Sequence, residues 1–292
     1  MFSTKAIFVK LAYRHDVDAL SLLMLRMLFA LPFFLVLGIW QYTSTEGGSE
    51  IIKRYKWRLI GLGLLGYYIA SYFDLKGLEL IDASLERMIL FLYPTVVVFL
   101  SFLIYKVQIK RSQVIAICIG YLGMYLVFQG NAGSHASKSV LEGSLLVLIS
   151  TITYSLYLVG TGELSKKLGS VIYNSITMTI AALAIIIHNT IFHGFNLFDF
   201  TPPVYLYALA ISIISTVIPS YLIVEGIRIV GANHSSILGF VGPVSTIILA
   251  IVILGEQISA VQAVGSMVVF GAVVFTVIQK DNPAQSSSTK DE

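Results

Sequence analysis

The 292-residue chain has one cysteine and few charged residues. Because Cys118 stands alone, no disulfide can form within the chain and no cysteine cluster can hold a metal. Charged residues occupy only 12% of the positions, about half the share typical of soluble domains. The net charge is only +3, and the basic residues fall in short connections. Nucleic acid is therefore not an expected partner.

Several catalytic signatures are also missing from the sequence. It contains no HExxH pair, no GxSxG turn, no P-loop and no dinucleotide-binding fingerprint. We therefore predict no catalytic residue, no metal site and no cofactor, and we do not expect an enzyme. An enzyme embedded in the membrane is the weak alternative. A cleavable signal peptide is not expected either, because residues 1–13 carry Lys5 and Lys10 and lack a small-residue cleavage site.

What the chain has instead is long apolar segments. Hydrophobic residues make up 57% of the sequence, and the mean hydropathy is +0.85. A membrane-spanning helix needs about 20 apolar residues. Nine segments meet this requirement: 19–40, 57–75, 83–105, 112–128, 143–160, 171–192, 204–224, 235–254 and 260–279. Residues 1–13 are apolar as well but would cover only about 18 Å. We interpret them as the outer half of a first span, which gives ten spans in all.

A long passage of the sequence occurs twice. Residues 77–129 and 226–280 share one plan, and an offset of 149 pairs Pro94 with Pro243 and Gly77 with Gly226. With five spans in each half, the two copies must cross the membrane in opposite directions. The expected fold is an all-α polytopic membrane protein of ten transmembrane helices, built as two inverted five-helix repeats. The expected domains are residues 1–129 and 142–280, followed by a disordered cytoplasmic tail at 281–292.

Lysine and arginine predict the orientation, because cytoplasmic connections carry an excess of both. One set of connections holds twelve of these residues and the opposite set about three. The C-terminus and the connection 41–56 are therefore expected in the cytoplasm, with the protein multi-pass in a cell membrane, most simply a bacterial inner membrane. The lipid bilayer is thus a partner. The sequence leaves the oligomeric state open, and a homodimer is allowed.

Short motifs across both halves carry a resemblance to a known family. In the first half these are Phe2-Ser3-Thr4-Lys5, Arg26, Gly77-Leu78, Ala83-Ser84-Leu85-Glu86-Arg87 and Tyr93-Pro94. In the second half they are Gly231-Ala232, Pro243, Leu254-Gly255-Glu256, Gly265 and Gly271. Together they resemble the EamA family of the drug/metabolite transporter superfamily. The first copy departs from the pattern where Lys106-Val107 replaces the Gly-Glu pair. The resemblance implies a secondary transporter for an amino acid or related metabolite, often in the export direction.

Charged residues within spans are functional candidates, because a charge in lipid costs several kcal/mol unless it is paired or faces water. Lys5 and Arg26 would lie roughly 10–12 Å below the outer surface, and Glu86 and Arg87 would lie near the same side. We predict that Lys5 and Arg26 bind a carboxylate of the substrate, with Glu86 as partner or proton carrier. The alternative is structural: Arg26 and Arg87 tie helices together through Glu86, and Lys5 extends outward. For Arg87 the structural role is favoured.

Tyrosines and prolines supply the other candidates. Tyr68 and Tyr72 share a helical face, as do Tyr154 and Tyr157, and Tyr93 lies in the next span. Together with Tyr67, these side chains suit a cavity for a small amphipathic metabolite, although helix packing explains any single tyrosine equally well. Pro94 and Pro243 are expected at a hinge or cavity, because each removes a backbone hydrogen bond within a helix. Pro219 is a third such proline.

Two functions follow from these observations. The preferred one is a secondary transporter that moves a small metabolite by alternating access between its inverted halves. The alternative is a non-transporting membrane scaffold or partner subunit, in which the ionisable side chains are buried against protein without a connected polar cavity. The two functions differ in where they place Lys5, Arg26, Glu86 and the tyrosines relative to a central cavity.

Overall fold

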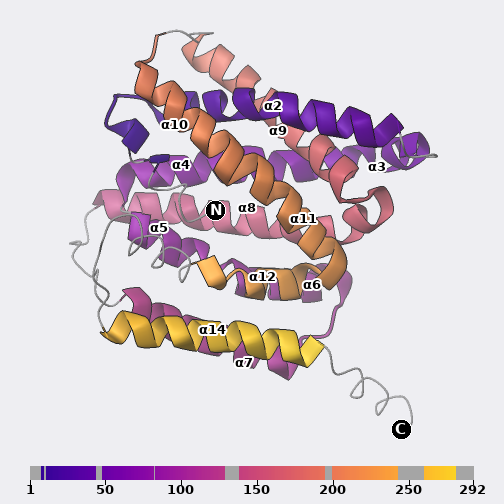
Figure 1. Cartoon of the computed structure of the whole chain (residues 1–292), viewed down its shortest axis with the longest axis vertical. Helices are drawn as coiled ribbons and strands as arrows, with labels where there is room; N and C mark the ends of the chain where they lie inside the picture. The colour runs from indigo at the N-terminus through magenta and orange to yellow at the C-terminus, as the bar shows by residue number, and fades with distance from the viewer. Residues whose placement is uncertain are drawn as a thin grey trace.

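The computed structural model describes residues 8–9, 11–43, 48–81, 83–128, 138–194, 199–242 and 260–280, and the elements in these ranges are all helical (Figure 1). The all-α polytopic fold expected from the sequence is confirmed. Lys5, Pro243 and the tail at 281–292, all named in the sequence analysis, lie outside the described residues.

The first half of the chain contains α2 (Ala19–Thr43), α3 (Gly48–Gly63), η1 (Leu64–Ile69), α4 (Ala70–Leu80), α5 (Ala83–Leu90), α6 (Tyr93–Tyr105) and α7 (Arg111–Phe128). The second half contains α8 (Lys138–Leu168), α9 (Ser170–His193), α10 (Pro202–Ser212), η3 (Ile213–Val217), α11 (Ile218–Val230), α12 (Ala232–Leu238) and α14 (Ala260–Lys280). The two η segments are π-helices, continuous with the α-helices on both sides.

Apolar helices make up most of this bundle. Within the described residues, five helical segments are long and apolar enough to cross a membrane: Ala19–Thr43, Leu85–Tyr105, Ser139–Leu168, Ser170–Phe192 and Pro202–Val230. Two of them join consecutive elements: Leu85–Tyr105 includes α6 and most of α5, and Pro202–Val230 includes α10, η3 and α11. Many large apolar side chains point outward, as on the outer faces of α9 and α10, where Ile191, Phe192 and Leu206 are about 70% exposed. Such a surface suits lipid, which needs no polar groups from the protein.

Several helices extend beyond the apolar segments predicted for them. The helix that contains the predicted span 57–75 begins at Gly48, and α8 continues to Leu168 rather than ending at residue 160. The added turns carry charged residues, such as Lys53 and Arg54 on α3 and Lys166 and Lys167 on α8. Hydropathy marks only the apolar part of a helix, whereas the backbone hydrogen bonds continue into the polar region.

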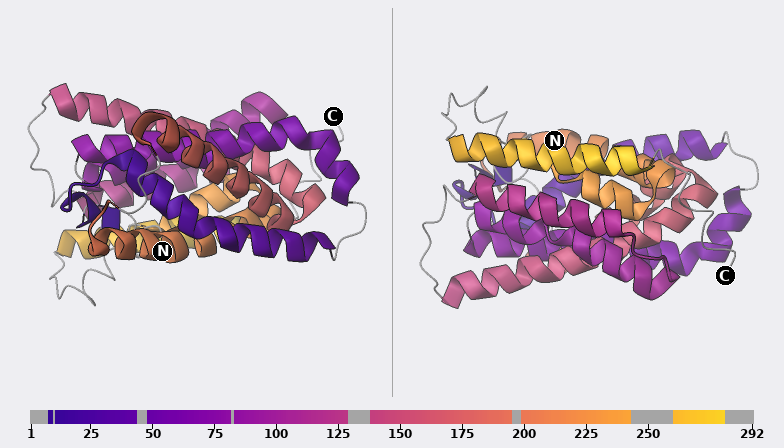
Figure 2. Two further views of the ribbon diagram at one scale, coloured as in Figure 1. Left: turned by 90° about the horizontal axis from the view of Figure 1, so that it is seen from above. Right: turned by 90° about the horizontal axis from the view of Figure 1, so that it is seen from below.

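The two halves repeat the same order of elements. The offset of 149 that pairs Pro94 with Pro243 also maps the first residue of η1 onto that of η3, α5 onto α12, and α7 onto α14. Corresponding helices pack together in antiparallel pairs, α2 with α9 and α7 with α14 (Figures 1 and 2). Antiparallel pairing of equivalent helices is the geometry of an inverted repeat.

The predicted span 83–105 is broken rather than bent. Helix α5 ends at Leu90, two residues form a turn, and α6 begins at Tyr93 with Pro94 in its first turn. The proline ring excludes the carbonyl of the residue four positions earlier, here Leu90, and offers no N–H. In the second half, α12 ends at Leu238 and a turn follows at the corresponding point. Each half thus contains a discontinuous helix near the centre of the bundle.

Candidate functional site

A cavity of about 460 Å³ lies at the centre of the bundle. Both halves build its wall: η1, α4 and the α5–α6 break from the first, and α8, α11 and the end of α12 from the second. Apolar side chains such as Leu158 and Ile223 cover much of the wall. The polar groups among the lining residues are Arg26, Tyr67, Ser71, Asp74, Arg87, Tyr93, Ser150, Thr151, Tyr154, Ser235 and Ser236. A mostly apolar cavity with a few placed polar groups is the usual form of a small-molecule site.

Arg26 is the more deeply buried of the two cations that line this cavity among the described residues. Its side chain on α2 is only 3% exposed, and its Nε donates a hydrogen bond of 2.6 Å to Thr216 Oγ1 on η3. Its buried Nη1 nitrogen has no hydrogen-bond partner among the described residues. A buried charged donor without a partner is costly. Because Arg26 lines the cavity, its guanidinium is a candidate for binding an anion there.

Besides Arg26, a second cation and a carboxylate line the same cavity. Asp74 on α4 is 3% exposed and lies close enough to interact electrostatically with Arg26. Arg87 lies on α5, where its Nε and Glu86 Oε2 are 3.1 Å apart. Glu86 itself is fully buried and is not among the lining residues. Among the described residues, the cavity therefore offers two cations and one carboxylate to a ligand, with a second carboxylate beside Arg87.

A tyrosine cluster forms one wall. The Tyr154 ring meets Tyr67 at 86° and Tyr93 at 69°, with ring centroids 6.5 and 6.1 Å apart. These three rings line the cavity. Tyr157 lies behind them, stacked on Tyr154 and Tyr173, and does not line it. Edge-to-face packing fixes the rings, so the wall is preformed.

The close approach of α12 to Tyr93 depends on Gly239. A Cβ built at this position would overlap the Tyr93 hydroxyl and lie 2.9 Å from the Ser236 carbonyl oxygen. Both Tyr93 and Gly239 line the cavity. Glycine therefore allows the ends of the two discontinuous helices to meet at the site.

Other residues singled out from the sequence lie elsewhere. The Tyr68 hydroxyl is 3.0 Å from His188 Nδ1, and the Tyr72 ring packs on the same histidine with centroids 5.2 Å apart. Both tyrosines thus face α9 and are not among the lining residues. Pro94 is buried at the start of α6, also outside the lining. The structure brings together Arg26, Tyr93 and Tyr154 and separates them from Tyr68 and Tyr72; the substrate-binding roles remain predictions.

Sequence reasoning overlooked Asp74 and the hydroxyl groups of α8 and α12. Asp74 is the next-to-last residue of the predicted span 57–75, so it resembled a boundary residue. A usable signal did exist, because Tyr67, Ser71 and Asp74 lie at positions i, i+4 and i+7 of one helical face. No such pattern identifies the hydroxyl groups of Ser150, Thr151, Ser235 and Ser236, since single hydroxyl groups are common in membrane helices.

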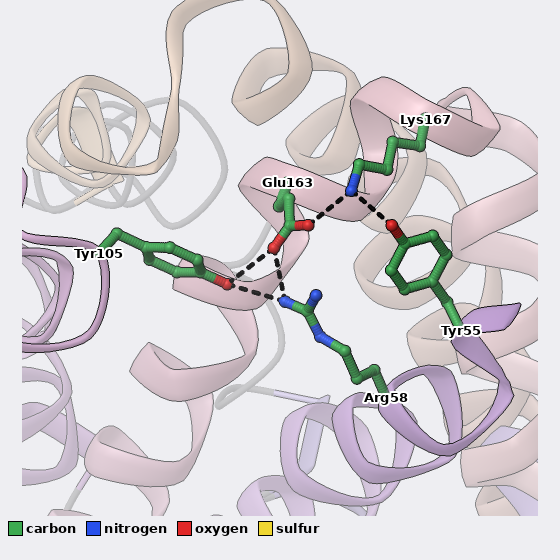
Figure 3. Close-up of polar contacts among 5 residues, drawn as sticks. All are labelled: Tyr55, Arg58, Tyr105, Glu163 and Lys167. Carbon is green, nitrogen blue, oxygen red and sulfur yellow. Dashed lines mark hydrogen bonds and ion pairs between the residues drawn. The ribbon is translucent and has the colours of Figure 1, made fainter.

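A second polar cluster lies at the end of the bundle where α2 leads into α3 (Figure 3). The Nη2 nitrogen of Arg58 donates to Glu163 Oε2 at 2.6 Å and to the Tyr105 hydroxyl at 3.0 Å. Lys167 Nζ donates to Glu163 Oε1 and to the Tyr55 hydroxyl, both at 2.7 Å. The hydrogen bond from Lys167 lowers the pKa of Tyr55 below its ordinary value. This end cluster joins α3 and α6 of the first half to α8 of the second.

Comparison with known proteins agrees with the duplicated helical fold. The model of the EamA-like transporter family matches residues 1–129 and again 141–278. The uncharacterized transporter YcbK of Bacillus subtilis (strain 168) is 28% identical over 281 residues, which are 94% of this chain and 88% of that protein. The uncharacterized transporter YetK of the same organism is 25% identical over 242 residues, 82% of this chain and 73% of its own.

A solved crystal structure supports the fold independently. It superposes with a TM-score of 0.75 at 16% identity and covers 96% of both chains. At that identity the likeness concerns the fold alone. The family match, in contrast, extends over both halves and nearly the whole chain. This protein belongs to the EamA-like transporter family and is a multi-pass, all-α membrane protein.

Proposed function

We propose that the protein is a secondary transporter that carries a small carboxylate-bearing metabolite through the central cavity. The observation that carries the proposal is Arg26: a guanidinium 3% exposed, whose Nη1 has no partner among the described residues, beside a cavity of about 460 Å³. A carboxylate matches the planar donors of arginine. Placed there, it would supply the missing hydrogen bond and neutralise a buried charge.

An amino acid fits this cavity well. Its carboxylate would face Arg26 while its ammonium group would face Asp74, the one acid among the described lining residues. Its side chain would then contact the apolar and tyrosine wall. The alternative of a scaffold without transport predicts ionisable groups buried against protein only, and the cavity beside Arg26 and Asp74 disfavours it.

Alternating access is the mechanism that the duplicated fold supports. The cavity lies between the two halves and is bordered by a discontinuous helix from each. In inverted-repeat transporters, rocking of one repeat against the other exposes such a central site to each side in turn. The chain would need no ATP hydrolysis of its own. We further propose a bacterial cytoplasmic membrane as its location, with export as the direction implied by the family.

Counterflow in proteoliposomes tests the proposal. Vesicles containing the purified protein are preloaded with each of the twenty L-amino acids, or with lactate or succinate, and uptake of the labelled compound is followed. We expect accumulation of at least one member, and loss of that accumulation in Arg26→Gln. Arg14→Gln, which changes an exposed arginine, is the matched control. Failure of every compound, or full uptake by Arg26→Gln, would contradict the proposal.

A further inference from the structure

Thr216 holds the Arg26 side chain through a single hydrogen bond. Its hydroxyl accepts from Arg26 Nε at 2.6 Å and donates to the Ile211 carbonyl oxygen at 3.0 Å. The one hydroxyl proton is therefore already used, and a lone pair is left to face the guanidinium. With Thr216 only 1% exposed, water does not compete for this position.

The π-helical turn places this hydroxyl differently from other helical threonines. Within the described helices, Thr151, Thr153, Thr161, Thr177 and Thr190 each donate to the carbonyl four residues earlier. Thr216 donates to the carbonyl five residues earlier, because it lies in η3. A π turn contains one extra residue and is frequently found at functional sites. Here it directs the hydroxyl across the bundle to α2.

The two π-helical segments occupy equivalent places in the two halves, and both lie beside Arg26. The offset of 149 maps Leu64, the first residue of η1, onto Ile213, the first residue of η3, and Tyr67 onto Thr216. Tyr67 lines the cavity and interacts electrostatically with Arg26. Arg26 itself maps onto Ser175, an uncharged residue hydrogen-bonded to Tyr221. Arg26 thus interacts with one residue from each of the two matched π turns, Tyr67 and Thr216.

We propose that Thr216 is a positioning residue: it fixes the guanidinium of Arg26, a residue that lines the cavity. An arginine side chain has several rotatable bonds, and the Nε–Thr216 hydrogen bond restricts them by holding the guanidinium at its inner edge. A residue of the second half, Thr216, would then orient the cation of the first half, Arg26. The role in transport rests on the proposed function, whereas the coupling between Thr216 and Arg26 does not.

Transport kinetics test the positioning role. The probes are the same panel of twenty labelled L-amino acids. We expect Thr216→Val to raise KM about tenfold for each transported member, the size expected for a lost hydrogen bond to a charged group. The maximal rate should change less than about twofold. Thr216→Ser keeps the acceptor and should stay within about twofold of the wild type. Thr177→Val removes a buried hydroxyl that, among the described residues, bonds to backbone of its own helix, and it should also stay near the wild type.

A substrate-free measurement keeps the inference separate from the proposed function. Unfolding temperatures of the wild type, Thr216→Val, Arg26→Gln and the double variant form a double-mutant cycle. We expect Thr216→Val to lower the unfolding temperature in the wild type and to leave it nearly unchanged in Arg26→Gln. An equal loss in both backgrounds overturns the inference, as does unchanged KM in Thr216→Val. If no probe is transported, the proposed function fails while the cycle still decides the coupling.

A second variant covers the case in which the valine protein does not fold. Thr216→Cys is close to threonine in size, and its sulfur accepts hydrogen bonds only weakly. It should show the same rise in KM and the same dependence on Arg26 as the valine variant. Kinetics and unfolding like those of Thr216→Ser would overturn the inference.

Discussion

Arg58 on α3 and Glu163 on α8 form an ion pair of 2.6 Å that links the first half of the chain to the second. The pair belongs to the end cluster of Figure 3, in which Glu163 also binds Lys167 at 2.7 Å. Since the side chains of Arg58 and Glu163 are 43% and 30% exposed, solvent screens the attraction and its contribution to stability is small. Its position between the halves makes it a contact that must break if they rock apart at this end.

Glu163→Gln removes the negative charge shared by Arg58 and Lys167. We expect the unfolding temperature to fall by about 2 °C, because exposed ion pairs contribute little in a protein of this size. The loss should shrink in about 1 M salt, where the screening length is near 3 Å. Glu225→Gln is the matched control, since the ion pair of Glu225 with Arg228 lies within α11 and does not link the two halves. A loss that persists at high salt would show that the cluster acts through packing instead.

Asp74→Asn tests recognition of an ammonium group. If Asp74 holds the ammonium of an amino acid, this variant should lose affinity for amino acids by about tenfold. Competition by des-amino carboxylates of the same carbon skeleton should be retained. The measurement is inhibition of labelled amino-acid counterflow by each unlabelled compound. Equal losses for both classes would mean that Asp74 does not contact the ammonium group.

Gly239→Ala tests the close approach at the cavity. Because the new Cβ would overlap the Tyr93 hydroxyl, we expect a loss of about 1–3 kcal/mol in unfolding free energy. Adding Tyr93→Phe removes that hydroxyl and should restore part of the loss. Gly271→Ala is the control, since a Cβ there meets no atom of the described residues within 4 Å. Denaturation in detergent measures all three, and a Gly239→Ala protein as stable as the wild type would refute the packing argument.

Reporter fusions test the orientation. Helix α14 ends at the same end of the bundle as the α2–α3 connection (Figure 1), which the excess of lysine and arginine assigns to the cytoplasm. A fluorescent protein fused after the C-terminus should therefore mature, and alkaline phosphatase fused there should stay inactive. Phosphatase fused after α9, which ends at the opposite end of the bundle, should be active. The reverse pattern would invert the proposed topology.

The sequence was informative about the fold because lipid imposes a simple rule. A chain that crosses a membrane must hide its backbone in helices of fixed minimum length, so apolar segments predict helices directly. The internal repeat was also visible in the sequence, since the offset that pairs Pro94 with Pro243 reappears in the helix boundaries. Arg26 was identifiable for the same reason: a cation in an apolar helix needs a partner or a cavity.

Which side chains meet was decided only by the tertiary structure. The spacing of Tyr68 and Tyr72 correctly placed them on one face, but packing turned that face toward His188 on α9. The adjacent Tyr67 faces the cavity instead, in register with Ser71 and Asp74. Helical periodicity relates the faces of one helix to each other at about 100° per residue, whereas the rotation of the whole helix depends on its neighbours.

The π turns illustrate the same limit. No residue pattern in 64–69 or 213–217 predicted a π-helical turn. The turn at 213–217 nevertheless brings Thr216 to Arg26. Hydropathy and repeat length determined that this protein is a duplicated bundle of membrane helices. Only the packing of the two halves decided that a cation of one is held by a hydroxyl of the other, because such contacts depend on helix rotation and backbone register rather than on composition.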